Sequence, residues 1–131
     1  MWLLHIEDDV AVQRTLRRSL RVITDLEVVC ACSLAAALEA YRARRPHEPL
    51  ALIADFDLGS SEPDGVAAVA ALRRAGLVRP CAFLTSTPEG DVRRRLAAES
   101  VTDPITLWPK PDGISGAVEW LTAIAMSRAT A

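Results

Sequence analysis

Acidic side chains follow two separate apolar runs in this 131-residue chain. Glu7 and Asp8 come directly after residues 2–6, and Asp55 comes directly after residues 50–54. If the two runs form neighbouring strands, these carboxylates crowd together and repel one another unless a cation compensates their charge. Mg²⁺ prefers oxygen ligands and commonly shares carboxylates with a phosphate. The spacing therefore predicts a Mg²⁺ site, in which Asp55 has the chemistry of a nucleophile that attacks phosphorus.

Two further residues stand at the ends of later apolar runs and have side chains that bind phosphoryl oxygens. Thr85 follows residues 81–84 and offers a hydroxyl donor. Lys110 comes shortly after residues 105–108 and is the only lysine of the chain. Its compact ammonium suits a phosphoryl oxygen better than the planar fork of an arginine does. Together with Asp55, these residues predict a site for phosphoryl transfer.

These residues depend on a regular alternation of elements to bring them together. Short apolar runs predict five strands, at residues 2–6, 27–32, 50–54, 81–84 and 105–108. A helix-spaced apolar pattern follows each run and predicts five helices. The alternation predicts an α/β fold, namely a flavodoxin-like, doubly wound, five-stranded parallel sheet of order 2-1-3-4-5. In such sheets ligands bind at the carboxyl ends of the strands, where the residues above stand.

The predicted helices carry local signals of their own. Asp64 precedes the third helix and is expected to be its N-cap. The first helix carries arginines on the face opposite its apolar residues, at Arg14, Arg17, Arg18 and Arg21. Residues 93–95, all arginine, are expected to form the solvated face of the fourth helix.

Composition and charge narrow the classes of function. Half of the residues are hydrophobic and 24% are charged, which is typical of a globular protein. The net charge of −2 argues against a strongly basic nucleic-acid surface, so no direct nucleic-acid partner is expected. Cys30, Cys32 and Cys81 are interpreted as buried, reduced thiols of a cytoplasmic protein. No apolar run approaches the roughly 20 residues of a membrane span.

Five short motifs, in this order and spacing, resemble those of the receiver domain of two-component response regulators. They are Ile6-Glu7-Asp8-Asp9, the run Ile53-Ala54-Asp55-Phe56-Asp57-Leu58, Asp64-Gly65, Leu84-Thr85-Ser86 and Lys110-Pro111. The resemblance extends from Trp2 to the last helix. It implies a receiver domain over residues 1–126, with residues 127–131 as a C-terminal tail or the start of a linker.

The resemblance implies a role for each residue of the site. Asp55 would accept a phosphoryl group from a phosphohistidine on a histidine kinase or a histidine phosphotransfer protein. Glu7 and Asp8 would hold Mg²⁺, together with Asp55 and the backbone carbonyl of Asp57. Thr85 would bind phosphoryl oxygens, as would Lys110.

Further implied features concern hydrolysis and the output of the domain. Asp57 and Thr87 would tune hydrolysis, and Pro111 would follow a cis peptide bond. Leu107 stands at the switch position, where the family usually has an aromatic residue. Phosphorylation would reshape the face of the fourth helix, fifth strand and fifth helix, which would bind a downstream effector or a second copy of the chain.

Two alternatives remain open at this point. A degenerate receiver would serve as an interaction module that works without phosphorylation. A Mg²⁺-dependent phosphatase of the haloacid-dehalogenase type would use Asp55 and Asp57, although that motif normally ends the first strand. The activity favoured by the sequence is phospho-acceptance with slow self-dephosphorylation rather than the turnover of a metabolite.

Overall fold

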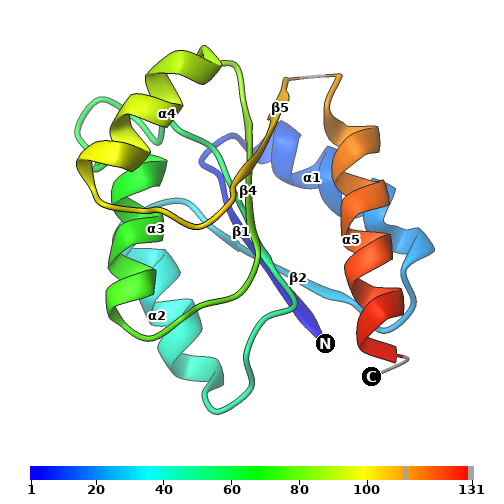
Figure 1. Cartoon of the computed structure of the whole chain (residues 1–131). Coiled ribbons are helices and arrows are strands. Elements are labelled where there is room, and N and C mark those ends of the chain that lie inside the picture. Colours follow the sequence, from blue (N-terminus) through cyan, green and yellow to red (C-terminus); the bar gives the residue numbers. More distant parts are fainter. Residues whose placement is uncertain (111, 130–131) are drawn as a thin grey trace.

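A five-stranded parallel sheet forms the centre of the protein, in a computed structural model that describes residues 1–110 and 112–129 (Figure 1). The strand order is β2-β1-β3-β4-β5, which confirms the predicted flavodoxin-like fold. The strands are β1 (Trp2–Ile6), β2 (Glu27–Ala31), β3 (Leu52–Ala54), β4 (Cys81–Thr85) and β5 (Thr106–Pro109). Each neighbouring pair is parallel, as the alternation of strands and helices predicts.

Helices cover both faces of the sheet. Those of the described part of the chain are α1 (Val10–Ser19), α2 (Leu34–Arg44), α3 (Gly65–Arg74), α4 (Glu89–Ala98) and α5 (Ile114–Ala129), with a short 3-10 turn η1 (Leu20–Val22) after α1. The helices α2, α3 and α4 lie on one face, and α1 and α5 lie on the other (Figure 1). Helix α5 includes residues 127–129, and the boundary expected at residue 126 stays a prediction.

The three central strands β1, β3 and β4 are buried because both faces of the sheet are covered. All five residues of β1 are buried, and successive side chains point to opposite faces. Leu4 and Ile6 pack in the cluster beneath α2, α3 and α4, whereas Leu3 packs in the cluster beneath α1 and α5. At about 1.5–3 kcal/mol for each large apolar side chain, this two-sided burial supplies the main stabilisation of the fold.

The register of the strands brings the expected site residues to one edge. Ile6 pairs with Ala54, the last residue of β3, and the Asp55 N–H donates to the Ile6 carbonyl at 2.8 Å. On the other side of the sheet centre, the Lys110 N–H donates to the Thr85 carbonyl at 3.2 Å. The carboxyl ends of β1, β3, β4 and β5 therefore meet at the same level.

Two helix starts are fixed close to this edge. The Asp9 carboxylate caps α1 and accepts a hydrogen bond from the Ala11 N–H at 2.8 Å. Asp64 caps α3, as predicted, and accepts from the Ala67 N–H at 2.8 Å. A Cβ on Gly65 would lie 1.8 Å from the backbone oxygen of Asp55. Only glycine therefore lets α3 begin this close to the end of β3.

The three cysteines differ in their burial. All three thiols are free, with Cys81 buried and Cys30 half-buried. Cys32 is exposed, so the expectation of burial is wrong for this residue, which follows the edge strand β2.

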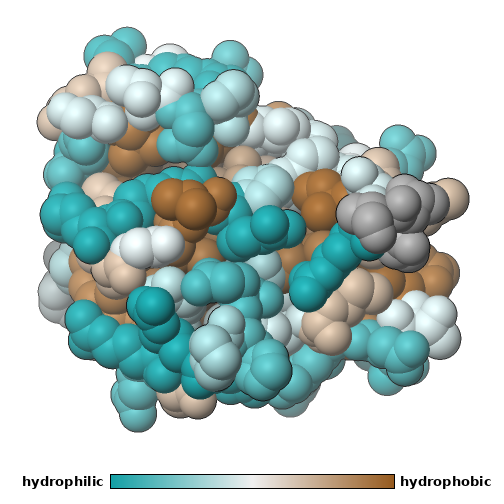
Figure 2. Space-filling model, turned by 60° about the horizontal axis from the view of Figure 1, so that its bottom comes forward, coloured by the Kyte–Doolittle hydropathy of each residue, from teal (hydrophilic) through white to brown (hydrophobic). Residues whose placement is uncertain are grey.

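At the amino-terminal end of the strands, hydrophobic patches are separated by hydrophilic side chains (Figure 2). No helix in the described ranges is long and apolar enough to cross a membrane.

Candidate functional site

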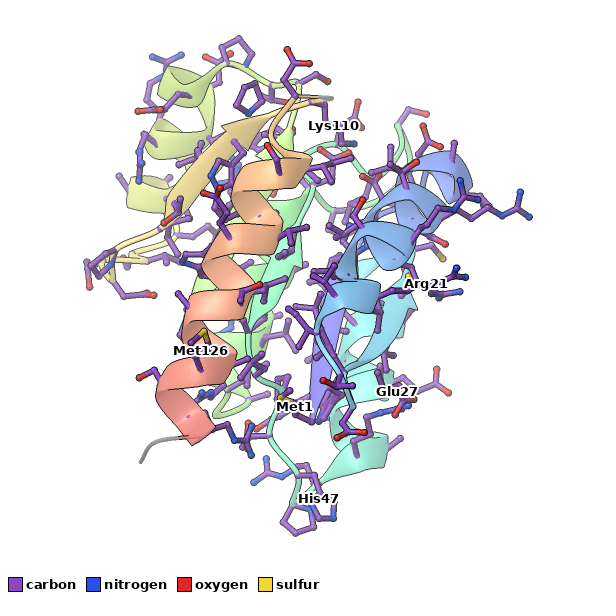
Figure 3. All side chains as sticks on the ribbon, turned by 90° about the vertical axis from the view of Figure 1, so that its right-hand side faces the viewer. Met1, Arg21, Glu27, His47, Lys110 and Met126 are labelled. Carbon is purple, nitrogen blue, oxygen red and sulfur yellow. The ribbon has the colours of Figure 1, made fainter. Side chains whose placement is uncertain are left out.

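Three carboxylates gather where β1 and β3 end. One oxygen from each of Glu7, Asp8 and Asp55 lies within 4.8 Å of the others. Lys110 reaches this group from the end of β5, at the opposite end of the molecule from Met1 and His47 (Figure 3). Three carboxyl groups thus face a single ammonium group, a set that fits a further divalent cation.

Asp55 is held from two sides and is almost buried. Its Oδ1 accepts a hydrogen bond from the Phe56 N–H at 2.7 Å, and its Oδ2 accepts one from Lys110 Nζ at 2.8 Å. Only 6% of the residue is exposed. Hydrogen bonds to charged groups are the stronger kind, so the carboxylate has a fixed orientation at the sheet edge.

Glu7 is completely buried, and the ionised form of its carboxyl group is destabilised by this environment. Its Oε2 accepts from the Asp9 N–H at 3.2 Å. Its Oε1 lies 2.6 Å from Lys110 Nζ but accepts no hydrogen bond of good geometry from the described residues. Burial, with a further contribution from the negative charge of Asp55, raises the pKa of Glu7 to about 7, although Lys110 acts in the opposite direction.

Lys110 bridges two carboxylates with one ammonium group. Burial acts to lower its pKa, but the contacts with Asp55 and Glu7 outweigh burial and raise the pKa above its ordinary value. The side chain therefore stays charged across the physiological range. Its backbone N–H is held by the Thr85 carbonyl, so the end of β5 is fixed to the end of β4.

Thr85 is buried at the same edge, at the end of β4. Its Oγ1 accepts a hydrogen bond from the Thr87 N–H at 3.2 Å. This bond uses an oxygen lone pair and leaves the hydroxyl proton free to be donated. The hydroxyl is thus available as a donor at the same edge of the sheet as the carboxylates.

Two of the expected residues lie at the periphery of the site. The Asp57 side chain is exposed, and its Oδ1 accepts from the Gly59 N–H at 3.0 Å, so this carboxylate orders the loop after β3. Thr87 is half-buried and lines a groove of about 310 Å³ together with Thr85 and Leu107. Pro111, for which a cis bond was expected, lies outside the described residues.

Leu107, the residue expected at the switch position, and its neighbour Trp108 pack on opposite faces of the sheet. Leu107 packs against the cluster beneath α2, α3 and α4, while its neighbour Trp108 packs on the opposite face beneath α5. The Trp108 ring meets Trp120 edge to face, with 5.5 Å between the ring centroids. A large aromatic side chain is therefore present in β5, but on the face away from α4.

Two side chains near the site were not predicted. Gln13 of α1 donates from Nε2 to the Glu7 carbonyl at 2.6 Å and so orders the turn between β1 and α1. Arg95 of α4 binds both carboxylate oxygens of Asp64, at 2.8 and 3.2 Å, instead of lying free in solvent. This pair joins α4 to the first turn of α3. Neither residue has a spacing or motif in the sequence that points to its partner.

Comparisons with known proteins find likeness at the level of structure only. No family model matches the chain, and no curated protein matches it. A response regulator receiver protein from Pseudoalteromonas atlantica superposes with a TM-score of 0.77 at 15% identity, covering 98% of this chain and 99% of that one. The chemotaxis protein CheY4 of Vibrio cholerae gives a TM-score of 0.75 at 18% identity, covering 94% and 97%.

A third structure extends the same likeness. The phosphorylated cyanobacterial phytochrome response regulator RcpA gives a TM-score of 0.70 at 18% identity, covering 94% of this chain and 89% of that one. At these identities the comparisons concern the fold, and they cover nearly the whole chain. The chain has the fold of response regulator receiver domains.

Proposed function

We propose that the protein is a phospho-accepting receiver of a two-component phosphorelay. The observation that carries this proposal is the half-buried Lys110 side chain, whose ammonium contacts Asp55 and Glu7 at the carboxyl edge of a receiver-type sheet. A carboxylate oxygen of Asp55 attacks the phosphorus of a phosphohistidine on a histidine kinase or histidine phosphotransfer protein. The P–N bond breaks, the imidazole leaves, and an aspartyl phosphate forms.

The donor set fits Mg²⁺. Glu7, Asp8 and Asp55 supply carboxylate oxygens within 4.8 Å of one another, and the buried Glu7 Oε1 has no well-formed hydrogen bond from a described residue. These three residues would hold the ion, with the backbone carbonyl of Asp57 as a further ligand. When bound, Mg²⁺ supplies positive charge that offsets the negative charge of the carboxylates and the phosphoryl oxygens.

The remaining residues bind and position. Lys110 places an ammonium where phosphoryl oxygens would lie, and the free Thr85 hydroxyl proton is available to the same oxygens. Asp57 and Thr87 flank the site and would control how easily water reaches the aspartyl phosphate, so self-dephosphorylation is slow. This chemistry is phospho-acceptance, not the turnover of a free metabolite.

The output face we propose consists of α4, β5 and α5. The Lys110 N–H to Thr85 carbonyl bond links the acceptor site to β5, and the groove of about 310 Å³ beside Thr85 leaves room for that side chain to move. A downstream effector, or a second copy of the chain, would bind this face. Leu107 in place of an aromatic residue means that the switch would work through an aliphatic side chain.

One observation favours a second candidate, an interaction module that works without phosphorylation. Both Asp55 oxygens already have partners, and only 6% of the residue is exposed. In that case the Lys110 ion pair would be structural. The haloacid-dehalogenase alternative is weaker, because Asp55 follows the third strand of the chain and not the first.

The test is the intact mass of the protein after incubation with acetyl phosphate, with and without Mg²⁺. Wild type is expected to gain one phosphoryl group only when Mg²⁺ is present, and Asp55→Asn is expected to gain none. Asp57→Asn is the matched control, because it makes the same change at an exposed aspartate two residues further along the chain. This variant should still be phosphorylated. A folded wild type that gains no mass and binds no beryllofluoride would identify the interaction module instead.

A further inference from the structure

Two cysteines stand on either side of Ala31, where the edge strand β2 ends. Cys30 lies in β2 and is half-buried, whereas Cys32 is the first residue after the strand and is exposed. In the parallel register Cys30 pairs with His5, and Ala31 pairs with Ile6, the last residue of β1. The two thiols therefore stand beside the carboxyl end of β1, which leads into the acceptor site.

The Cys30 sulfur has two polar contacts on the α1 side of the sheet. Arg17 Nη2 donates to it at 3.4 Å, and Nδ1 of the buried His5 lies 4.0 Å from it. Burial raises the pKa of Cys30, although the charge of Arg17 acts in the opposite direction. The thiol is therefore protonated at neutral pH, and the guanidinium stabilises negative charge that forms on the sulfur during a reaction.

The residue between the two cysteines holds the backbone of the acceptor site. The Ala31 carbonyl accepts a hydrogen bond from the Glu7 N–H at 2.9 Å. Ala31 is buried and packs in the cluster beneath α2, α3 and α4. Glu7 contacts Lys110 and supplies one of the three clustered carboxylates. A change in the backbone at Ala31 therefore reaches Glu7 through one direct hydrogen bond.

We propose that Cys30 and Cys32 form a reversible disulfide when the protein meets a hydroperoxide, and that this disulfide weakens the acceptor site. Cys32 reacts first because it is exposed. Its thiolate attacks one peroxide oxygen, the O–O bond breaks, and the leaving hydroxide or alkoxide takes up the proton that the thiol lost. The Cys30 sulfur then attacks the sulfur of the Cys32 sulfenic acid, and the S–O bond breaks. The hydroxyl leaves with the Cys30 proton as water, so two thiols are oxidised and one hydroperoxide is reduced.

Closing this ring contracts the end of β2. The chain is extended on both sides of Cys32, since Ala31 ends the strand and Ser33 has a φ of −156° and a ψ of 168°. Cα atoms two residues apart in such a chain are separated by about 6.6 Å. Disulfides most often join Cα atoms about 5.5–6 Å apart. The chain therefore has to bend at Ala31, which moves its carbonyl away from the Glu7 N–H and makes the disulfide easy to reduce.

The effect on the acceptor site rests on the proposed function, since Glu7 acts there as a ligand of Mg²⁺. The loss of a group that orients a metal ligand typically weakens metal binding by about 10–100-fold. We therefore expect the oxidised protein to bind Mg²⁺ at least about tenfold more weakly than the reduced protein. By linkage, saturating Mg²⁺ should raise the reduction potential of the disulfide by at least about 30 mV.

The first experiment treats reduced protein with hydrogen peroxide in EDTA, removes the excess, and alkylates the remaining thiols after denaturation. The expected product is a monomer that has lost two hydrogen atoms and takes up one alkyl group in place of three, because only Cys81 keeps its thiol. Dithiothreitol should restore the reduced form. Cys30→Ser and Cys32→Ser are the matched variants, and neither should form a disulfide within one chain.

Backbone amide shifts of labelled protein in EDTA test the link to Glu7 without any metal or phosphoryl donor. Oxidation of wild type should move the Glu7 amide resonance, dithiothreitol should return it, and peroxide treatment of Cys30→Ser should leave it in place. Calorimetry with Mg²⁺ then compares the affinities of the oxidised and reduced forms.

Three results would overturn the proposal. The first is a folded protein in which peroxide yields a sulfinic acid at Cys32, or a disulfide between two copies, while Cys30 stays free. The second is a Cys30–Cys32 disulfide that leaves the Glu7 amide resonance unmoved in EDTA. The third is equal Mg²⁺ affinity of the two forms. If reduced wild type binds no Mg²⁺, the proposed function fails, whereas the alkylation count and the Glu7 shift still decide whether the disulfide forms and reaches Glu7.

Discussion

Replacing Glu7 with glutamine is expected to stabilise the metal-free protein at neutral pH, although it removes the partner of a lysine. Glu7 is fully buried, and burial raises its pKa from 4.5 to about 7 despite the contact with Lys110. Each pKa unit corresponds to about 1.4 kcal/mol. Keeping Glu7 ionised above pH 7 therefore destabilises the fold by about 3 kcal/mol.

A separate estimate from geometry gives the same size. Oxygens of Glu7 and Asp55 lie within 4.8 Å of each other. At an effective dielectric constant of about 20, two unit charges at this separation repel by about 3 kcal/mol. Repulsion between the two carboxylates thus adds to burial, which is the larger cause of the raised pKa, while Lys110 offsets part of both.

The sign of the pH dependence follows from proton binding. Between pH 4.5 and pH 7 the folded protein keeps the Glu7 proton that the unfolded chain releases. The free energy of unfolding therefore falls as pH rises through this window and levels off above it. Glu7→Gln has no proton to lose at this position. It should match wild type near pH 4.5 and exceed it by about 2–3 kcal/mol at pH 8.

The assay is urea unfolding in EDTA at a series of pH values from 4.5 to 8. Asp57→Asn, which removes an exposed charge from the same edge, is the control and should follow the wild-type pH dependence. Adding Mg²⁺ should reduce the difference in the free energy of unfolding between Glu7→Gln and wild type, because only wild type keeps the full set of carboxylates that would bind the ion. If Glu7→Gln is no more stable than wild type at pH 8, the argument that uncompensated charge defines this site is refuted.

Three further predictions concern the same edge of the sheet. Mg²⁺ at ten times its Kd should raise the stability of wild type by about 1.4 kcal/mol, and calorimetry should find little effect for Asp8→Asn. Lys110→Arg should accept phosphoryl groups at least about tenfold more slowly by intact mass, because a planar fork replaces a compact charge between Asp55 and Glu7. Gly65→Ala should lower the free energy of urea unfolding by about 2 kcal/mol or more, because its Cβ would meet the Asp55 backbone. Gly90→Ala on α4, whose Cβ would lie 3.6 Å from the Arg94 side chain, should be neutral or slightly stabilising.

The sheet could be predicted from sequence because its signals are local. Short apolar runs bounded by acids or prolines mark buried parallel strands, and a parallel sheet aligns their carboxyl ends. Glu7, Asp55 and Lys110 could therefore be placed together before their distances were known. The N-cap role of Asp64 was predictable for the same reason, since it depends only on the residues that follow it.

What the sequence did not predict depends on packing between distant segments. The contact of Arg95 with Asp64 depends on how α3 and α4 are placed relative to each other. The sequence alone does not distinguish Arg95 from the two arginines that precede it. The exposure of Cys32 depends on its place after an edge strand. Trp108 and Leu107 are neighbours in sequence, and which of them faces α4 is set by strand register.

The Arg95–Asp64 contact has a consequence for how the protein can respond to a signal. Asp64 holds the start of α3 with Oδ1, and it binds Arg95 of α4 with both Oδ1 and Oδ2. Breaking this contact, with the buried side chains of α4 left in place, would remove two partly exposed, charge-assisted hydrogen bonds, at a free energy of about 1–2 kcal/mol in total. That corresponds to roughly a tenfold preference for the paired arrangement. Such a bias keeps most molecules in one conformation at rest, yet a single bound ligand or modification can reverse it, so the response would be a redistribution between two discrete populations.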